Sequence, residues 1–346
     1  MRSGCHTALI TPFTADGSQV DREGLEQLTQ FQFNNKIAGI LAVGTTGESP
    51  TLTWDEHHEV VDSVCATIKD DCVCIAGAGS NNTREALAAT EHAAKQGADA
   101  ALLVDPYYNG PSSLEIRREY VGPIAEAFPS IDLIPYVIPG RTGAKLMPED
   151  LALLYSAYPN VRTVKEATGD LDNMRRTREC CGPDFTILSG DDALLVEMMT
   201  DKAIDAAGVI SVASNVAPRA MTELVDLLNT GDTAKANQLA EALKPLFGLV
   251  TVTTRESTAY GEVACRARNP LAIKTFMALL GMPSGPCRRP LGKMTRKGLD
   301  VVVSVARQVQ TNNPEILQPI ADCFGVDIAE RLDNPEYQKG LCYDAY

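Results

Sequence analysis

The sequence predicts a (β/α)8 barrel, an α/β fold, followed by a C-terminal helical region. Eight short apolar runs recur at regular intervals, with amphipathic helical patterns between them. Most of these runs lack polar alternation, which is typical of strands buried on both faces of a parallel sheet. Eight strand–helix units in about 230 residues suit a closed barrel. The alternative is an open doubly wound sheet, but no G-x-G-x-x-G motif follows the first run.

The elements follow one another in a simple order. The predicted strands are residues 6–10, 39–43, 73–76, 100–104, 133–137, 161–165, 185–189 and 206–211. Helical patterns lie between them, and several begin after a capping residue such as Asp21, Thr53 or Asn82. From about Ala217 to Gln310 the chain is predicted to be helix only. The predicted domains are 1–218 for the barrel, 219–310 for the helical region and 311–346 for an acidic extension that docks in part.

Composition excludes several classes of protein. The formal net charge is −14 with no basic face, so we expect no nucleic-acid partner. No apolar run is long enough to span a membrane, and the first residues lack a signal-peptide core, so we expect a cytoplasmic protein. None of the ten cysteines forms a CxxC pair, and buried free thiols are the default.

Polar residues gather where the predicted strands end, which is where a (β/α)8 barrel carries its active site. One lysine, Lys165, stands at the end of the sixth strand. It is joined by tyrosines, hydroxyl groups, one arginine and glycine-supported backbone amides. These groups lie at residues 44–49, 105–109, 136–142, 190–192 and 211.

Two common kinds of site fit this inventory poorly. The four histidines are scattered and form no HExxH or comparable cluster, so we expect no metal and no other cofactor. The segment GTTGES (44–49) does not match the phosphate-binding pattern G-x-x-x-x-G-K-[ST].

A lysine inside a barrel without a metal points to imine chemistry. Desolvation lowers the pKa of a lysine amine and exposes the lone pair, which can then condense with a ketone. From position alone, the alternative that Lys165 is a structural ion-pair partner, for example of Glu166, stays open.

The chain resembles the dihydrodipicolinate synthase / N-acetylneuraminate lyase family of pyruvate-dependent Schiff-base enzymes. The resemblance rests on motifs that occur in family order over residues 1 to about 308. They are GTTGESPTL (44–52), DPYYNGPS (105–112), PYVIPGRTG (135–143), VKEATGDL (164–171), ILSGDD (187–192), GVISVASNVAP (208–218) and NPLAIK (269–274).

The resemblance implies a role for each matching residue. Lys165 would form the Schiff base with pyruvate, and Tyr136 would move protons over the imine. Thr46 would relay protons between Tyr136 and Tyr108, where the family's second tyrosine comes from a neighbouring subunit. Backbone amides of Thr45 and Thr46 would hold the pyruvate carboxylate, and Arg141 the carboxylate of the second substrate. The matching substrate-binding set also includes Gly190 and Ile210.

Some residues depart from the family pattern. Pro135 and Val137 flank the catalytic tyrosine, where leucine and asparagine are usual, so we expect them to bear on the choice of acceptor aldehyde. Asp105 stands where threonine or valine is frequent. Residues 253–268 look like an insertion before the NPLAIK motif.

The synthase branch of the family condenses pyruvate with aspartate β-semialdehyde in lysine biosynthesis, and the paired threonines and Arg141 favour it. The alternatives are a sister aldolase acting on a sugar acid and a non-catalytic metabolite-binding paralogue. The resemblance further implies a homotetramer or dimer. It also implies an inhibitory lysine site at Trp54, His57, Asn81, Glu85 and Tyr107, next to Pro50.

Overall fold

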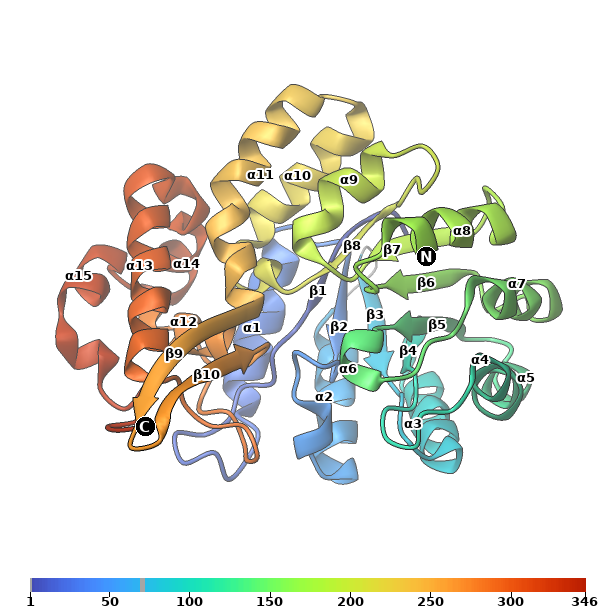
Figure 1. The fold of residues 1–346 in the computed structure, drawn as a ribbon, viewed down its shortest axis with the longest axis horizontal. Coiled ribbons are helices and arrows are strands. Elements are labelled where there is room, and N and C mark those ends of the chain that lie inside the picture. The colour runs from blue at the N-terminus through green and yellow to red at the C-terminus, as the bar shows by residue number, and fades with distance from the viewer. Residues whose placement is uncertain (1, 69–71) are drawn as a thin grey trace.

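Eight parallel strands form a closed barrel in the computed structural model, which describes residues 2–68 and 72–346. Each strand pairs with the next, and β1 also pairs with β8, which closes the sheet (Figure 1). The predicted fold class is confirmed. The strands are β1 (Gly4–Ala8), β2 (Gly39–Ala42), β3 (Val73–Gly77), β4 (Ala100–Val104), β5 (Asp132–Val137), β6 (Thr163–Glu166), β7 (Thr186–Ser189) and β8 (Gly208–Ser211).

Helices surround the barrel, and those that the sequence predicts after Asp21, Thr53 and Asn82 are capped by these residues. The Thr53 and Glu56 side chains form a reciprocal capping box, and the Asp21 carboxylate accepts from the backbone N–H of Gly24. The helices are α1 (Arg22–Asn34), α2 (Trp54–Thr67), α3 (Thr83–Lys95), α4 (Ser113–Glu115), α5 (Gly122–Ala127), α6 (Pro139–Thr142), α7 (Pro148–Ala157), α8 (Leu171–Cys181), α9 (Leu195–Thr200) and α10 (Pro218–Thr230), with a π-helical turn at Ile116–Val121.

The strands separate two apolar cores. A small cluster fills the barrel interior, and a larger one lies between the strands and the surrounding helices. On β5, Tyr136 belongs to the inner cluster whereas Val137 belongs to the outer one. This alternation follows from the period of two along a strand, and it decides which strand residues can face the site.

The C-terminal region is not helix only, so that prediction is wrong for residues 251–268. These residues form an antiparallel hairpin of β9 (Thr251–Thr258) and β10 (Gly261–Arg268), in which Arg268 pairs with Thr251. Alternating burial along β9 marks a strand with one face on the protein body. The helices of the region are α11 (Thr233–Phe247), α12 (Leu271–Leu280) and α13 (Arg296–Asn312).

The acidic extension packs on the body through two further helices, α14 (Gln318–Phe324) and α15 (Ile328–Asp333). Phe324 contacts Phe31 of α1, with ring centroids 5.3 Å apart. The Arg331 guanidinium donates to the carbonyl oxygens of Leu279 and Ala278 at 2.8 and 3.0 Å, which caps the end of α12. Within the described residues, no helix has the length and apolar character that a membrane crossing requires.

Candidate active site

A cavity of about 200 Å³ opens at the C-terminal ends of the barrel strands. Its walls come from the segments that follow β2, β5, β6, β7 and β8, together with the base of the β9–β10 hairpin. Most of the residues predicted from the sequence meet here. The lining residues are Thr45, Thr46, Tyr136, Ile138, Gly140, Arg141, Lys165, Ala167, Gly190, Asp191, Asp192, Val212, Val250, Thr251, Arg268 and Asn269.

Lys165 lies on β6 and is buried, with 4% of its surface exposed. Burial lowers the pKa of its amine to about 7; the Asp192 carboxylate opposes this shift and the Arg141 charge adds to it. The neighbouring Glu166 carboxylate instead accepts from the Thr168 backbone N–H at 2.7 Å and from Asn173. The alternative of a Lys165–Glu166 ion pair is therefore not favoured, and a substantial fraction of the amine is neutral at pH 7.

Tyr136 lies beside Lys165 because the two residues are register partners on β5 and β6. The Lys165 Nζ atom is 4.2 Å from the centre of the Tyr136 ring. Burial raises the pKa of the Tyr136 phenol to about 12, although Arg141 and a hydrogen bond with the Thr45 side chain lower it in part. The phenol is thus protonated at neutral pH and stands next to the amine as a proton donor.

Gly190 and Asp192 follow β7 and complete the surroundings of the amine. A Cβ atom on Gly190 would lie 2.8 Å from the Ala167 Cβ atom and 3.2 Å from the Lys165 Cε atom, so a side chain there would collide with Ala167 and press on the lysine. The Asp192 carboxylate accepts from the backbone N–H groups of Val212 and Ala213 at 3.0 and 2.9 Å. Burial nevertheless raises its pKa.

Thr45 and Thr46 belong to the loop after β2, and both line the cavity. The Thr46 hydroxyl is buried and accepts a hydrogen bond from the Asn269 side chain at 2.9 Å. Asn269 was not among the predicted site residues, although its motif, NPLAIK, was recognised. Only its contact across 223 positions of sequence places it in the site.

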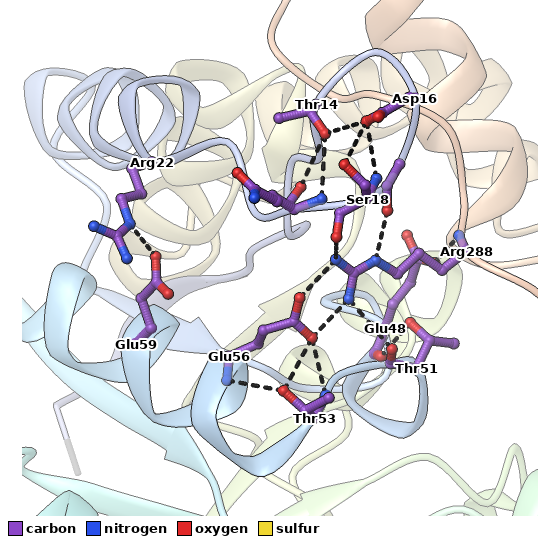
Figure 2. A network of polar contacts seen from close by, with 12 residues as sticks. Thr14, Asp16, Ser18, Arg22, Glu48, Thr51, Thr53, Glu56, Glu59 and Arg288 are labelled. Atoms are coloured by element: carbon purple, nitrogen blue, oxygen red, sulfur yellow. Dashed lines mark hydrogen bonds and ion pairs between the residues drawn. The ribbon is translucent and has the colours of Figure 1, made fainter.

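A buried ion pair supports this loop from below. Glu48 has a left-handed backbone conformation, and its carboxylate accepts from the Lys274 amine at 2.7 Å and from the Arg288 backbone N–H at 2.9 Å. Figure 2 shows the Arg288 guanidinium lying between Glu56 and the loop that contains Ser18. Both guanidinium N–H groups that face Glu56 donate at 2.7 Å. The C-terminal region thereby fixes the threonine loop, since a buried pair of this kind tolerates little displacement.

Arg141 stands at the mouth of the cavity, on the short helix α6. Its guanidinium donates to the Asn269 carbonyl oxygen at 3.3 Å. Burial lowers its pKa, as do the like charges of Arg268 and Arg266. A second cavity, of about 190 Å³, shares Thr45, Tyr136 and Arg141 with the first and extends to Pro50 and Tyr107.

Two predicted site residues lie apart from the cavity. Tyr108 is 86% exposed and does not line it, so in this chain alone it meets neither Thr46 nor Tyr136. Ile210 is buried in the barrel interior, in the same apolar cluster as Tyr136.

The predicted lysine-binding residues form two small groups, and one of their members, Tyr107, lines the second cavity. The Asn81 side-chain oxygen accepts a hydrogen bond from the Tyr107 backbone N–H at 2.6 Å. Burial raises the pKa of the Tyr107 phenol, and the negative charge of Glu85 raises it further. Trp54 packs on His57, with ring centroids 4.9 Å apart. Burial lowers the pKa of His57 to about 4, so its ring is neutral at pH 7. Among the described residues, no group of three or more His, Cys, Asp or Glu side chains is placed to hold a metal ion.

The departures at β5 lie outside the site. Val137 packs in the outer core, and neither it nor Pro135 lines either cavity. Their expected influence on the acceptor is therefore not supported by direct contact. Asp105 is also buried away from the cavity; burial raises the pKa of its carboxyl group to about 7.

Comparisons with known proteins agree with this geometry. The model of the dihydrodipicolinate synthetase family matches residues 1–309. A 4-hydroxy-tetrahydrodipicolinate synthase of Thermosynechococcus vestitus is 40% identical over 303 residues, which are 88% of this chain and 94% of that protein.

Solved structures give the same result. The dihydrodipicolinate synthase of Acinetobacter baumannii complexed with pyruvate is 32% identical, with a TM-score of 0.80 over 89% of this chain and 99% of its own. The enzyme of Cyanidioschyzon merolae with lysine bound is 34% identical, with a TM-score of 0.80 over 89% of this chain and 98% of its own.

Proposed function

The chain belongs to the dihydrodipicolinate synthetase family, and from that premise we propose how it acts as a 4-hydroxy-tetrahydrodipicolinate synthase, a lyase of lysine biosynthesis. It condenses pyruvate with aspartate β-semialdehyde. One observation carries the mechanism: a desolvated amine, Lys165, lines the cavity with a protonated phenol, Tyr136, beside it.

The first half of the reaction uses Lys165 as the nucleophile. The neutral amine attacks the carbonyl carbon of pyruvate, and loss of water from the adduct gives the imine. The protonated imine withdraws electrons, so a methyl proton of pyruvate can leave and an enamine forms. Because about half of the amine is neutral near pH 7, no further base is needed to deprotonate it before attack.

Tyr136 is the proton carrier of this half. Its raised pKa keeps the phenol protonated between steps, and the hydrogen bond with Thr45 orients it. The phenol can protonate the leaving hydroxyl group and take up a proton again from the pyruvate methyl group. The backbone amides of Thr45 and Thr46 would donate hydrogen bonds to the pyruvate carboxylate. Gly190, which has no side chain, would leave room for it.

The second half joins the enamine to the aldehyde carbon of aspartate β-semialdehyde. Arg141 lies at the mouth, where a planar guanidinium suits the two oxygens of the substrate's carboxylate. The new carbon–carbon bond forms as the aldehyde oxygen takes up a proton, and attack of the substrate's amino group on the imine carbon then releases Lys165 and closes the ring.

Tyr108 links catalysis to assembly. We propose that it enters the site of a second copy of the chain and continues the proton path from Thr46, in a dimer or in a homotetramer built from two dimers. Its 86% exposure in the single chain supports a role that only a partner would complete. Mixing two inactive variants, Tyr108→Phe and Lys165→Ala, tests this, because a mixed dimer regains one complete site.

Lysine inhibition is proposed for the groups around Trp54 and Tyr107. The ammonium and carboxylate of lysine would meet Glu85 and Asn81, and the aliphatic stem would lie on Trp54, which is 37% exposed. A lysine titration of the rate tests the site, with Glu85→Gln as the desensitised variant and Glu91→Gln, on the exposed side of α3, as its control. No effect up to millimolar lysine, the range of weak binding, would overturn the proposal.

The reaction itself is tested by pyruvate consumption. We expect consumption with aspartate β-semialdehyde and none with N-acetylneuraminate or 2-keto-3-deoxygluconate in the cleavage direction. Borohydride with pyruvate should add mass to Lys165 of the wild type and nothing to Lys165→Ala. Trapping without consumption would indicate a sister aldolase, and absence of trapping a metabolite-binding protein. The ten cysteines, all free, fit a reducing compartment, and we propose the cytoplasm.

A further inference from the structure

The β9–β10 hairpin begins and ends at the active site. Val250 and Thr251 at its start, and Arg268 and Asn269 at its end, all line the cavity that contains Lys165. The Asn269 backbone N–H donates to the Val250 carbonyl oxygen at 2.8 Å, which ties the base together. In Figure 1 the arrow of β10 runs from the tip of the hairpin toward α6. The segment that looked like a plain insertion therefore contributes part of the site wall.

Arg268 and Arg141 face each other across this wall. The Arg268 guanidinium donates to the Gly140 carbonyl oxygen at 3.0 Å, and the Arg141 guanidinium donates to the Asn269 carbonyl oxygen at 3.3 Å. Each arginine thus holds the backbone next to the other. Each of these bonds uses one N–H group, so most of the five donors of each guanidinium remain for a ligand.

The part of the chain that the structure describes offers the two positive charges no acidic partner within ion-pair distance. Neither guanidinium forms an ion pair with any described residue, although Arg141 is half-buried. The two acidic residues of the cavity influence other groups: the charge of Asp192 raises the pKa of Lys165, and the charge of Asp191 raises the pKa of Tyr136. Two unpaired guanidinium groups at one opening of a protein with a net charge of −14 make a local anion site.

We propose that Arg268 is a specificity-determining residue which, together with Arg141, clamps the carboxylate of the acceptor aldehyde. The inference rests on the proposed function and adds a residue to it. The hairpin would select small aldehydes that carry a carboxylate, because an uncharged aldehyde leaves two like charges close together without a counter-ion. The binding of pyruvate, which the proposed mechanism places at Lys165, should not depend on Arg268.

Three substitutions at one position separate charge from structure. Arg268→Ala removes the charge and the bond to Gly140. Arg268→Lys keeps the charge, and Arg268→Gln keeps a donor for the Gly140 carbonyl oxygen without the charge. Arg255→Ala is the matched control, because Arg255 is an exposed arginine on the same hairpin that does not line the cavity.

Steady-state kinetics supply the test. In Arg268→Ala and Arg268→Gln we expect KM for aspartate β-semialdehyde to rise about tenfold, with kcat changed less than threefold and KM for pyruvate unchanged. In Arg268→Lys the rise in KM for aspartate β-semialdehyde should be about threefold or less, which is half of the tenfold rise on a logarithmic scale. Arg255→Ala should have the wild-type KM. An unchanged acceptor KM in Arg268→Ala would overturn the inference, as would full recovery by Arg268→Gln, which would reduce Arg268 to a support for Gly140.

A second measurement keeps the inference testable if the proposed function fails. The probe is succinate semialdehyde, which is aspartate β-semialdehyde without its amino group. Its dissociation constant is measured by calorimetry on enzyme whose Lys165 carries the borohydride-reduced pyruvate adduct. Weaker binding to Arg268→Ala than to the wild type supports the clamp whether or not the enzyme turns over. Equal binding contradicts the clamp, and a wild type without turnover contradicts only the proposed function.

Discussion

The floor and the mouth of the active site are built in different ways. The floor is made by Lys165, Tyr136 and Gly190, which lie on or directly after barrel strands and whose backbones are held by the closed sheet. The mouth is made by Arg141 on the short helix α6 and Arg268 on the hairpin, which hold each other through carbonyl oxygens. The proposed mechanism thus places the covalent chemistry on strands of the closed sheet, and the binding of the acceptor on a short helix and a hairpin.

The floor and the mouth also differ in the charge of their side chains. At the floor, burial removes charge: the Lys165 amine has a pKa of about 7 and the Tyr136 phenol about 12, so both can be neutral at pH 7. At the mouth, two guanidinium groups remain charged, because an arginine does not deprotonate in a protein. The floor is therefore suited to bond making and the mouth to anion binding. Substitutions at the floor should lower kcat, and substitutions at the mouth should raise KM for the acceptor aldehyde.

The largest effect is expected at the floor from Lys165→Ala. It removes the nucleophile, and kcat should fall on the order of 10⁴-fold or more because only binding contributions remain. Stopped assays of pyruvate consumption measure the loss. Lys202→Ala, an exposed lysine on the surface, is the control and should retain full activity. Residual activity within tenfold of the wild type would mean that another group carries the reaction.

Tyr136→Phe should be the next most severe change. It removes a general acid–base group without changing the shape of the ring, so kcat should fall about 10²- to 10³-fold while the fold is retained. Tyr155→Phe, at the contact with Phe185 on the far side of the strands, is the matched control. If Tyr136→Phe lowered the melting temperature and kcat in parallel with Tyr155→Phe, its role would be packing only.

Arg141→Ala should affect the mouth alone. We expect KM for aspartate β-semialdehyde to rise about 10- to 100-fold because a charge-assisted bidentate contact is lost. The yield of borohydride-trapped pyruvate, read by intact mass, should stay at the wild-type level. A matching loss of trapping would show that the floor and the mouth are not independent.

The smallest effect concerns pH and belongs to the floor. The pKa of Lys165 is lowered from 10.5 to about 7, so the amine is neutral above pH 7 and protonated below it. The rate of pyruvate trapping should be level above pH 7 and fall about tenfold per pH unit below it, since the protonated amine has no lone pair. Trapping rates between pH 6 and 11 measure this; an inflection near pH 10 in place of one near pH 7 would mean that the amine is solvated.

The hydrophobic period and the turn residues of the sequence were sufficient to predict the barrel and the residues at its strand ends, whereas the chemistry of those residues followed from the resemblance to the family. Eight short apolar runs, most of them without polar alternation, predicted all eight strands, and the strand ends indicated Lys165, Tyr136 and the Thr45–Thr46 pair. The same reasoning could not place Val137, which adjoins Tyr136 in the chain but faces the outer core. The side of a strand that a residue faces depends on register, and a shift of one residue would exchange the two faces.

Residues distant in sequence were the ones that escaped prediction. Asn269 reaches Thr46, and Arg268 reaches Gly140, only because the hairpin folds back onto the mouth. The local sequence does not predict such contacts, because the β propensity of a segment depends on the strands and side chains against which it packs. The segment around β9 and β10 was accordingly mistaken for part of a helical region.

By itself, then, the sequence determined the closed barrel and the residues of its floor, because local periodicity forces strands to alternate with helices and parallel strands deliver their ends to one face. The tertiary structure decided the rest: the desolvation that sets the pKa of Lys165, the support of the threonine loop by Lys274 and Arg288, and the meeting of Arg141 with Arg268. These depend on burial and on contacts between distant segments, and both arise only when the chain has folded.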